Sequence, residues 1–182
     1  MDQGASAQSR AWLAVGREIA EVLERVDSAA FEGAVEAFVN ERRRWFFSGQ
    51  GRSGLVAEMA AMRFMHMGRA AHFVGEATAP SIRAGDGLVL VSGSGETPVG
   101  IHYARIAKAE KAEIVLITRA PKSTLAGLAD RVLPAPVERT AQFGGSLFEE
   151  TSLILLDAIV LDLARRLPGA HERMLHRHTN LQ

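Results

Sequence analysis

The sequence predicts a single α/β domain built around a parallel sheet. After residue 44, short runs that are wholly apolar or rich in β-forming residues alternate with segments of helical length. A strand without polar alternation is buried on both faces, and helical connections between strands make a sheet parallel. The length of 182 residues fits one such domain, and no repeat interrupts the order. We therefore expect a three-layer α-β-α sandwich over residues 1–182, with five parallel strands in the order 2-1-3-4-5.

A pair of amphipathic helices is expected before the sheet, between residues 8 and 42. The apolar residues that recur at helical spacing are Trp12, Val15, Ile19, Val22, Leu23 and Val26, followed by Phe31, Val35, Phe38 and Val39. Ser28 is the expected N-cap of the second helix. Because the pair precedes the first strand, it must cover a face of the sheet or pack against another subunit.

The sheet and its flanking helices are expected between residues 44 and 168. The expected strands are the runs RWFFSG, AAHFVG, GLVLVSG, EIVLIT and RVLPAP. The expected helices cover 54–67, 97–111, 123–129 and 146–167, and the last helix ends at Pro168 and Gly169. The remaining residues, 169–182, are expected to form a carboxyl-terminal tail.

Composition and charge exclude several classes of protein. The 21 basic and 21 acidic residues leave no formal net charge, so we expect neither a nucleic-acid partner nor an anionic membrane. The absence of cysteine excludes disulfides and thiolate chemistry, and is compatible with a reducing cytoplasm. Apolar runs stay below about 18 residues, and the segment MDQGASAQSR lacks the apolar stretch of a signal peptide. We expect a cytoplasmic protein with a small-molecule partner.

Two strand-to-helix loops are rich in glycine and hydroxyl groups. The loop FSGQGRSG (47–54) follows the first strand, and SGSGETP (92–98) follows the third. With the expected strand order, both lie where the order reverses, which is where open parallel sheets bind ligands. Glycines let backbone N–H groups approach an anion, hydroxyls add donors, and helix N-termini add positive potential. A single such loop would be only a turn and an N-cap, but two loops at one edge predict a phosphate site.

The predicted phosphate ligands come from both loops. They are Ser48, Gly49, Arg52, Ser53, Ser92, Ser94, Gly95 and Thr97. Arg52 would help to neutralise the phosphate, although a plain surface arginine is an equally good interpretation. A nucleotide cradle is disfavoured, because no G-x-x-x-x-G-K-[ST] occurs and GQGRSG does not have the spacing of the dinucleotide fingerprint.

From about residue 47 to its end, the chain resembles the sugar isomerase (SIS) domain family. The hallmark of that family is a glycine-rich turn followed by a serine- and threonine-rich phosphate loop like SGSGET. Within it, the chain is similar to the 6-phospho-3-hexuloisomerases, and the ending RHTNLQ is slightly varied from theirs. The stretches that carry this likeness are GQGRSGLVAEMAAMRFMHMG, VGEATAPSI, GDGLVLVSGSGETPVG, STLAGLAD, GSLFEETSLILLDAIV and RMLHRHTNLQ.

The resemblance implies a flavodoxin-like homotetramer that interconverts D-arabino-hex-3-ulose 6-phosphate and D-fructose 6-phosphate without a cofactor, in the formaldehyde-fixing ribulose monophosphate pathway. Moving a carbonyl by one carbon requires a base, an enediolate intermediate and donors for its oxyanion. Two alternatives stay open. One is isomerisation of another sugar phosphate. The other is a non-catalytic sugar-phosphate sensor, although the residues before the first strand contain no basic recognition helix.

Glu149 is the base that the resemblance implies, near the start of the last long helix. Glu150 would point about 100° away around that helix, so the two cannot share one role. Acidic residues that merely stabilise a helix N-terminus are the competing explanation for both. Glu76, in GEATAP, is expected to contact sugar hydroxyls or to close a subunit interface.

His66 and His178 are the expected partners that handle hydroxyl protons, on their likeness to the family motifs. His66 ends a helix, so it could instead be a helix C-terminal cation; as a catalytic group it could act across a subunit boundary. The large apolar residues on its helix, Leu55, Met59, Met62 and Met65, are expected to pack in the core or between subunits. No carboxylate or cysteine set completes a metal site with His171, His176 and His178, so no metal is expected.

Overall fold

The fold is described by a computed structural model that covers residues 10–181. Its five-stranded sheet is parallel throughout, in the predicted order β2-β1-β3-β4-β5. The strands are β1 (Trp45–Gly49), β2 (Ala71–Phe73), β3 (Gly87–Val91), β4 (Glu113–Thr118) and β5 (Arg131–Pro134). Strand order reverses between β1 and β3, so the loops that leave these two strands share one edge.

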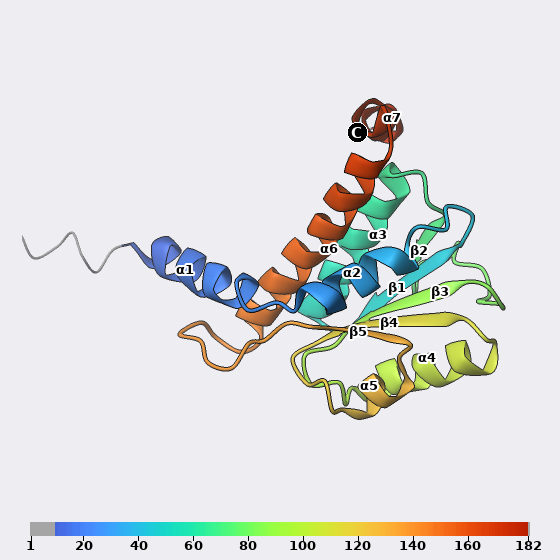
Figure 1. Cartoon of the computed structure of the whole chain (residues 1–182). Coiled ribbons are helices and arrows are strands. Elements are labelled where there is room, and N and C mark those ends of the chain that lie inside the picture. Colours follow the sequence, from blue (N-terminus) through green and yellow to red (C-terminus); the bar gives the residue numbers. More distant parts are fainter. Residues whose placement is uncertain (1–9, 182) are drawn as a thin grey trace, which may run out of the picture.

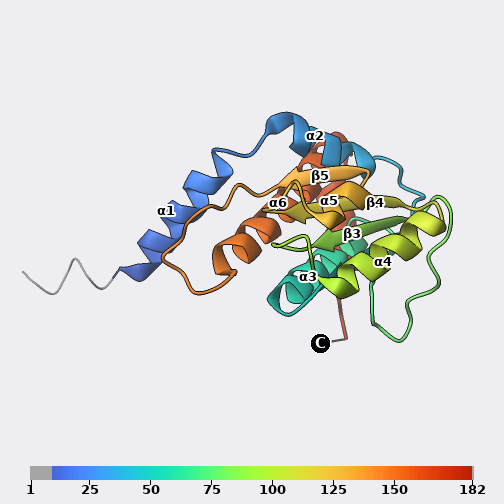
Figure 2. The same ribbon diagram turned by 90° about the horizontal axis from the view of Figure 1, so that it is seen from below.

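Helices cover both faces of the sheet and make the predicted three layers. They are α1 (Ala11–Leu23), α2 (Ser28–Ala37), α3 (Arg52–His66), α4 (Pro98–Ala109), α5 (Thr124–Leu128), α6 (Ser146–Arg166) and α7 (Ala170–Arg177). In Figure 1, α2, α3 and α6 lie on one side of the sheet, and α4 and α5 lie on the other. Figure 2 shows the same layers from below.

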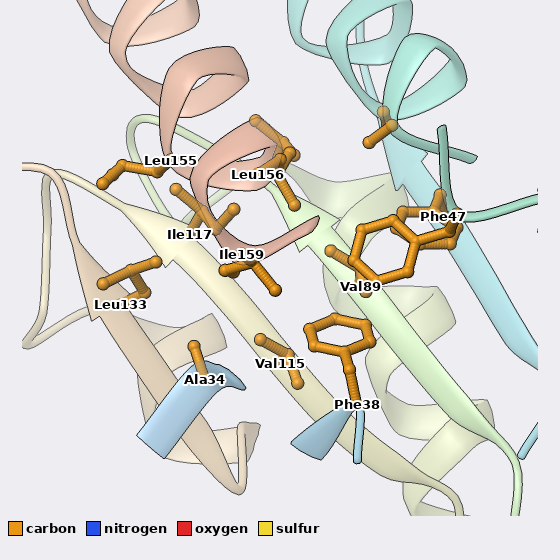
Figure 3. Close-up of a cluster of buried hydrophobic side chains, with 14 of the residues drawn as sticks. Ala34, Phe38, Phe47, Val89, Val115, Ile117, Leu133, Leu155, Leu156 and Ile159 are labelled. Atoms are coloured by element: carbon orange, nitrogen blue, oxygen red, sulfur yellow. The ribbon is translucent and has the colours of Figure 1, made fainter. Parts of the chain in front are cut away.

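The strand side chains divide between two cores with the period of two that a strand imposes. Phe47 and Val89 point into the larger core, under α3 and α6, while Phe46 and Leu88 point into the smaller one, toward α4. Figure 3 shows the larger core, which includes Phe38 of the amino-terminal segment and Phe47 of β1, and in which Ile159 of α6 covers the central strands. Burial on both faces explains the unbroken apolar runs in the sequence.

The two amino-terminal helices pack differently. The second, α2, packs against β5 and α6 and so covers a sheet face as expected, while α1 contacts α6 and extends away from the sheet (Figure 1). The prediction that Ser28 caps α2 is wrong: Asp27 is the N-cap, and its Oδ1 accepts the Ala30 N–H at 2.7 Å. A carboxylate one residue earlier supplies the same hydrogen bond. Residues 8 and 9 of the expected pair lie outside the described residues.

The segment predicted as a tail contains a helix, α7, which contacts α3 and α6. Its N-cap, Gly169, takes the left-handed conformation with φ +66°, which lets the chain turn sharply after Leu167. In Figure 1, α7 lies at the far end of α6, away from the start of that helix.

The apolar stripe on α3 is not part of the core. Its members, Leu55, Met59, Met62 and Met65, are all exposed, so the core interpretation is wrong and packing between subunits remains as a prediction. Within residues 10–181, none of the helices combines the length and the apolar character that crossing a bilayer requires.

Candidate functional site

The two glycine-rich loops line one small pocket at the carboxyl edge of the sheet. Ser48, Gly49 and Gln50 come from the β1–α3 connection, and Ser92 and Thr97 come from the β3–α4 connection. This confirms the prediction that the two loops face the same pocket. The reason is topological, since β1 and β3 are neighbours and parallel, with Gly49 beside Val91.

Close backbone approach explains the glycines of the first loop. A Cβ atom on Gly49 would lie 2.4 Å from the carbonyl oxygen of Ser53, so any larger residue would displace the start of α3. Gly51, the N-cap of α3, has φ +57°, which L-residues other than glycine rarely adopt. Ser48 and Ser53, on either side of this turn, are both buried.

The second loop is organised by its own hydroxyl groups. The buried Ser92 hydroxyl accepts the Gly95 N–H at 3.2 Å and is hydrogen-bonded to the Thr97 hydroxyl at 3.1 Å. Gly95 has φ +64°, and a Cβ atom there would lie 1.9 Å from the hydroxyl of Ser123. Ser94 is exposed, and its hydroxyl accepts the Glu96 N–H at 3.2 Å. Ser92 and Thr97 therefore hold the loop, while Ser94 faces solvent.

An acidic residue in a predicted phosphate loop calls for an explanation, and the contacts of Glu96 provide one. Its Oε1 accepts the backbone N–H of Thr124, the first residue of α5, at 2.7 Å. That hydrogen bond, together with one from the Thr124 side chain, lowers the pKa of Glu96. Gly95 also accepts the Leu125 N–H at 3.0 Å. The carboxylate thus fastens the loop to α5.

The N-termini of α3, α4 and α6 are among those that lie at this edge. In the described part of the chain, their N-cap residues, Gly51, Thr97 and Gly145, make no side-chain capping hydrogen bond. Uncapped first-turn N–H groups and the helix dipole favour an anion here. By contrast, α2 and α5 are capped by Asp27 and Ser123.

An ion pair joins the first loop to α6. Arg52, the first residue of α3, donates its Nε–H to Oε2 of Glu149. The Glu149 side chain is only 13% exposed, and that of Arg52 is 62% exposed. This hydrogen bond and the charge of the Glu149 carboxylate raise the pKa of Arg52, and Glu150 adds a smaller contribution. Next to Glu149, Phe148 packs against Gly93, where a Cβ atom would lie 3.2 Å from its ring.

The two candidate histidines, His66 and His178, lie at the carboxyl end of α3, opposite to Arg52. His66 is 4% exposed, and its ring stacks on that of His178, with centroids 5.2 Å apart and planes 15° apart. Burial lowers the pKa of His66, and the charges of Arg63 and His178 lower it further. At ~1.5 Å per residue, α3 separates Arg52 from His66 by roughly 20 Å. The structure therefore brings His66 and His178 together but does not bring them to Glu149 within one chain.

Glu76 lies beside a separate cavity. Its Oε1 is 2.9 Å from Nδ1 of His72, and it lines a cavity of about 330 Å³ with apolar neighbours such as Phe46 and Tyr103. This cavity shares no lining residue with the pocket of the two loops. Within residues 10–181, no cluster of three or more histidine, aspartate or glutamate side chains could hold a metal ion.

A protein-family match covers the part of the chain that forms the sheet and the two loops. The family model described as the SIS domain matches residues 38–164, a span that contains the whole sheet and both loops. The chain belongs to the SIS domain family. This confirms the resemblance seen in the sequence, and the five-stranded parallel sheet is the fold of this SIS domain.

Relatives of this SIS domain cover almost the whole chain. A Bacillus subtilis (strain 168) protein named 3-hexulose-6-phosphate isomerase is 37% identical, with 90% of this chain and 97% of the relative covered. A Mycobacterium gastri protein of the same name is 38% identical, with 91% and 86% covered. A Methanococcus jannaschii protein of solved structure, for which that function was inferred, has a TM-score of 0.84 and 30% identity, with 94% and 99% covered.

Two contributors to the SIS-domain pocket were missed by sequence reasoning. Gln50 lines the pocket between two glycines of the first loop, and its place in that loop was the available signal. Ser123 supports Gly95 from the β4–α5 connection, and nothing in its local sequence indicates contact with a loop that lies near residue 95.

Proposed function

We propose that this protein is a sugar-phosphate isomerase that interconverts D-arabino-hex-3-ulose 6-phosphate and D-fructose 6-phosphate. The observation that carries the proposal is the convergence of two glycine- and hydroxyl-rich loops with a partly buried carboxylate, Glu149, at one edge of the sheet. The relatives named 3-hexulose-6-phosphate isomerase support the choice of substrate.

The loops bind the phosphate of the substrate. Backbone N–H groups at the uncapped starts of α3 and α4 donate to its oxygens, and the exposed Ser94 hydroxyl adds a donor. Arg52 contributes a guanidinium, which matches phosphate in geometry and charge. The remaining proposed ligands, Ser48, Gly49, Ser53, Ser92, Gly95 and Thr97, shape the two loops or donate from them.

Glu149 acts as the general base. From fructose 6-phosphate it removes the proton on C3; the C–H electron pair forms a C2=C3 double bond, and the C2 carbonyl becomes the enediolate oxygen. The proton then returns to C2. The O3 hydroxyl gives up its proton as C3=O forms, and the enediolate oxygen on C2 gains a proton and becomes a hydroxyl. The reaction moves protons and electron pairs within the substrate, so it consumes no external oxidant or reductant.

His66 and His178 would serve the site of a neighbouring subunit, since about the length of α3 separates them from Glu149 in their own chain. There they would transfer the O2 and O3 hydroxyl protons. Glu76, beside its own cavity, would contact sugar hydroxyls or the subunit boundary. A homo-oligomer, which we propose to be a tetramer, is supported by the exposed apolar stripe on α3, where Leu55, Met59 and Met62 face solvent.

The decisive test is an activity assay with D-arabino-hex-3-ulose 6-phosphate, coupled to the detection of fructose 6-phosphate. We expect turnover of this substrate and much slower turnover of arabinose 5-phosphate and sedoheptulose 7-phosphate. Preferential turnover of either competitor would assign another substrate to the same site. Binding of sugar phosphates without turnover would instead identify a sensor. With the proposed substrate, the protein would act in the cytoplasm, in formaldehyde assimilation through the ribulose monophosphate pathway.

A further inference from the structure

We infer that Arg52 couples the binding of the substrate phosphate to the release of Glu149 as a base. The inference rests on the proposed function, because it assigns Arg52 a second partner within the same site. In the structure, the guanidinium of Arg52 is hydrogen-bonded to Oε2 of Glu149. The same guanidinium belongs to the loop that is proposed to hold the phosphate.

The two partners differ in their freedom to move. Arg52 is the more exposed partner, and its contact with Glu149 is made by a long, flexible side chain. The Glu149 carboxylate lies against the backbone of Gly145, where a Cβ atom would be 3.2 Å from Oε1, and the adjacent Phe148 packs on Gly93. When a competing anion enters, the arginine is therefore the side that reorients.

A phosphate is the stronger competitor for this guanidinium. A phosphate dianion carries more charge than a carboxylate and accepts two parallel hydrogen bonds from arginine. It would also be held by the helix N-termini of α3 and α4, next to the residue that must turn toward it. Binding of the phosphate thus offers Arg52 a better partner within reach of its own helix.

The exchange has a chemical consequence. While Arg52 donates to Oε2, the lone pair of Oε2 that accepts this hydrogen bond is not available to take a proton from carbon, so Glu149 is restrained as a base at that oxygen. When Arg52 turns to the phosphate, the oxygen becomes free beside the bound sugar. The phosphate group of the substrate then increases the rate of proton transfer as well as the affinity of the protein for the substrate. Sugars without phosphate react slowly because their proton transfer is not accelerated.

A substrate divided into two pieces tests this coupling. The probe is D-fructose in heavy water, with exchange of its C3 proton followed by NMR in the presence and absence of inorganic phosphite. We expect phosphite to accelerate exchange by the wild-type protein. In Arg52→Gln, exchange without phosphite should rise by about two- to fivefold, the range allowed by the strength of a partly exposed ion pair. The acceleration by phosphite should fall by at least about tenfold.

The controls separate coupling from simple phosphate binding. Arg83→Gln removes an arginine that pairs with Glu110 at the opposite edge of the sheet, and it should behave as wild type. Arg52→Lys keeps the charge and should retain part of the phosphite effect. Exchange in Arg52→Gln at or below the wild-type rate would overturn the coupling, even if phosphite activation were lost, because Arg52 would then only hold the anion.

A second measurement does not depend on turnover. A crystal structure with inorganic phosphate in the two loops should show the Arg52 guanidinium on the phosphate and no longer on Glu149. An intact Arg52–Glu149 pair beside the bound phosphate would overturn the inference. Wild-type turnover of fructose 6-phosphate distinguishes failure of the proposed function from failure of the coupling. Without turnover the proposed function fails, whereas turnover together with an intact Arg52–Glu149 pair rejects only the coupling.

Discussion

The ring of His66, the last residue of α3, stacks on the ring of His178, which follows α7, with centroids 5.2 Å apart. This contact lies at the end of α3, where His66 is buried. The carboxyl-terminal segment is therefore part of the packed structure.

The stability of the protein should fall as the pH drops below about 6.5. Burial, Arg63 and His178 lower the pKa of His66 in the folded state, so the unfolded chain binds that proton more tightly. The loss of stability begins near pH 6.5, the pKa of His66 in the unfolded chain, and is complete below its lowered pKa in the folded state. Urea unfolding at about pH 7.5 and about pH 5.5 measures it. His66→Gln should lose less stability between these conditions than wild type, whereas His171→Gln should match wild type. Equal losses in His66→Gln and wild type would contradict the prediction.

Replacing Glu149 by glutamine should remove the proposed base while keeping its shape. We expect kcat to fall by about 10²–10⁴, with little change in KM, because the phosphate contacts survive. Steady-state kinetics with fructose 6-phosphate measure the effect. Glu150→Gln is the matched control and should have a much smaller effect on kcat.

A Glu149→Gln enzyme with near-normal kcat would place the base elsewhere. His66→Ala and His178→Ala would then be the variants to measure. In heavy water, the wild-type enzyme should also incorporate solvent deuterium at least partly into the product carbon. A shielded proton transfer could suppress that incorporation, so the variant kinetics decide the assignment.

Removal of the Ser94 hydroxyl should weaken substrate binding without disturbing the fold, because Ser94 is exposed and Ser92 and Thr97 hold the loop. A lost hydrogen bond to a charged group corresponds to an increase in KM of about 10- to 100-fold. Thr97→Ala should also raise KM, and in addition removes a contact to Ser92. Ser81→Ala, in an exposed loop, is the control. Unchanged KM and unchanged inhibition by inorganic phosphate would contradict the assignment of the loop.

A charge placed in the apolar stripe of α3 should break the proposed assembly. Met59→Glu puts a carboxylate where an exposed methionine is proposed to pack against another subunit. Light scattering at micromolar concentration should show an oligomer for wild type and smaller species for the variant. Arg105→Glu, at an exposed position of α4, should leave the oligomer intact. A monomeric wild type would contradict the assembly.

Most of the fold could be predicted because its signals are local. The central strands β1, β3 and β4 are mostly apolar runs, since burial on both faces admits no polar alternation. Helical segments after β1, β3 and β4 indicated the parallel order. The N-cap of α2 was misplaced by one residue, because Asp27 and Ser28 can both supply the capping oxygen and only the backbone geometry selects between them.

The sequence by itself determined that two glycine-rich loops lie at one edge of a parallel sheet, because strand order and loop composition suffice for that. Only the tertiary structure decided that Arg52 reaches Glu149, that Ser123 supports Gly95, and that His66 meets His178 at the opposite end of α3. These pairs join segments far apart in the chain. Their distances depend on how α3, α5 and α6 pack on the sheet and how α7 packs on α3 and α6, and no local pattern of residues carries that information.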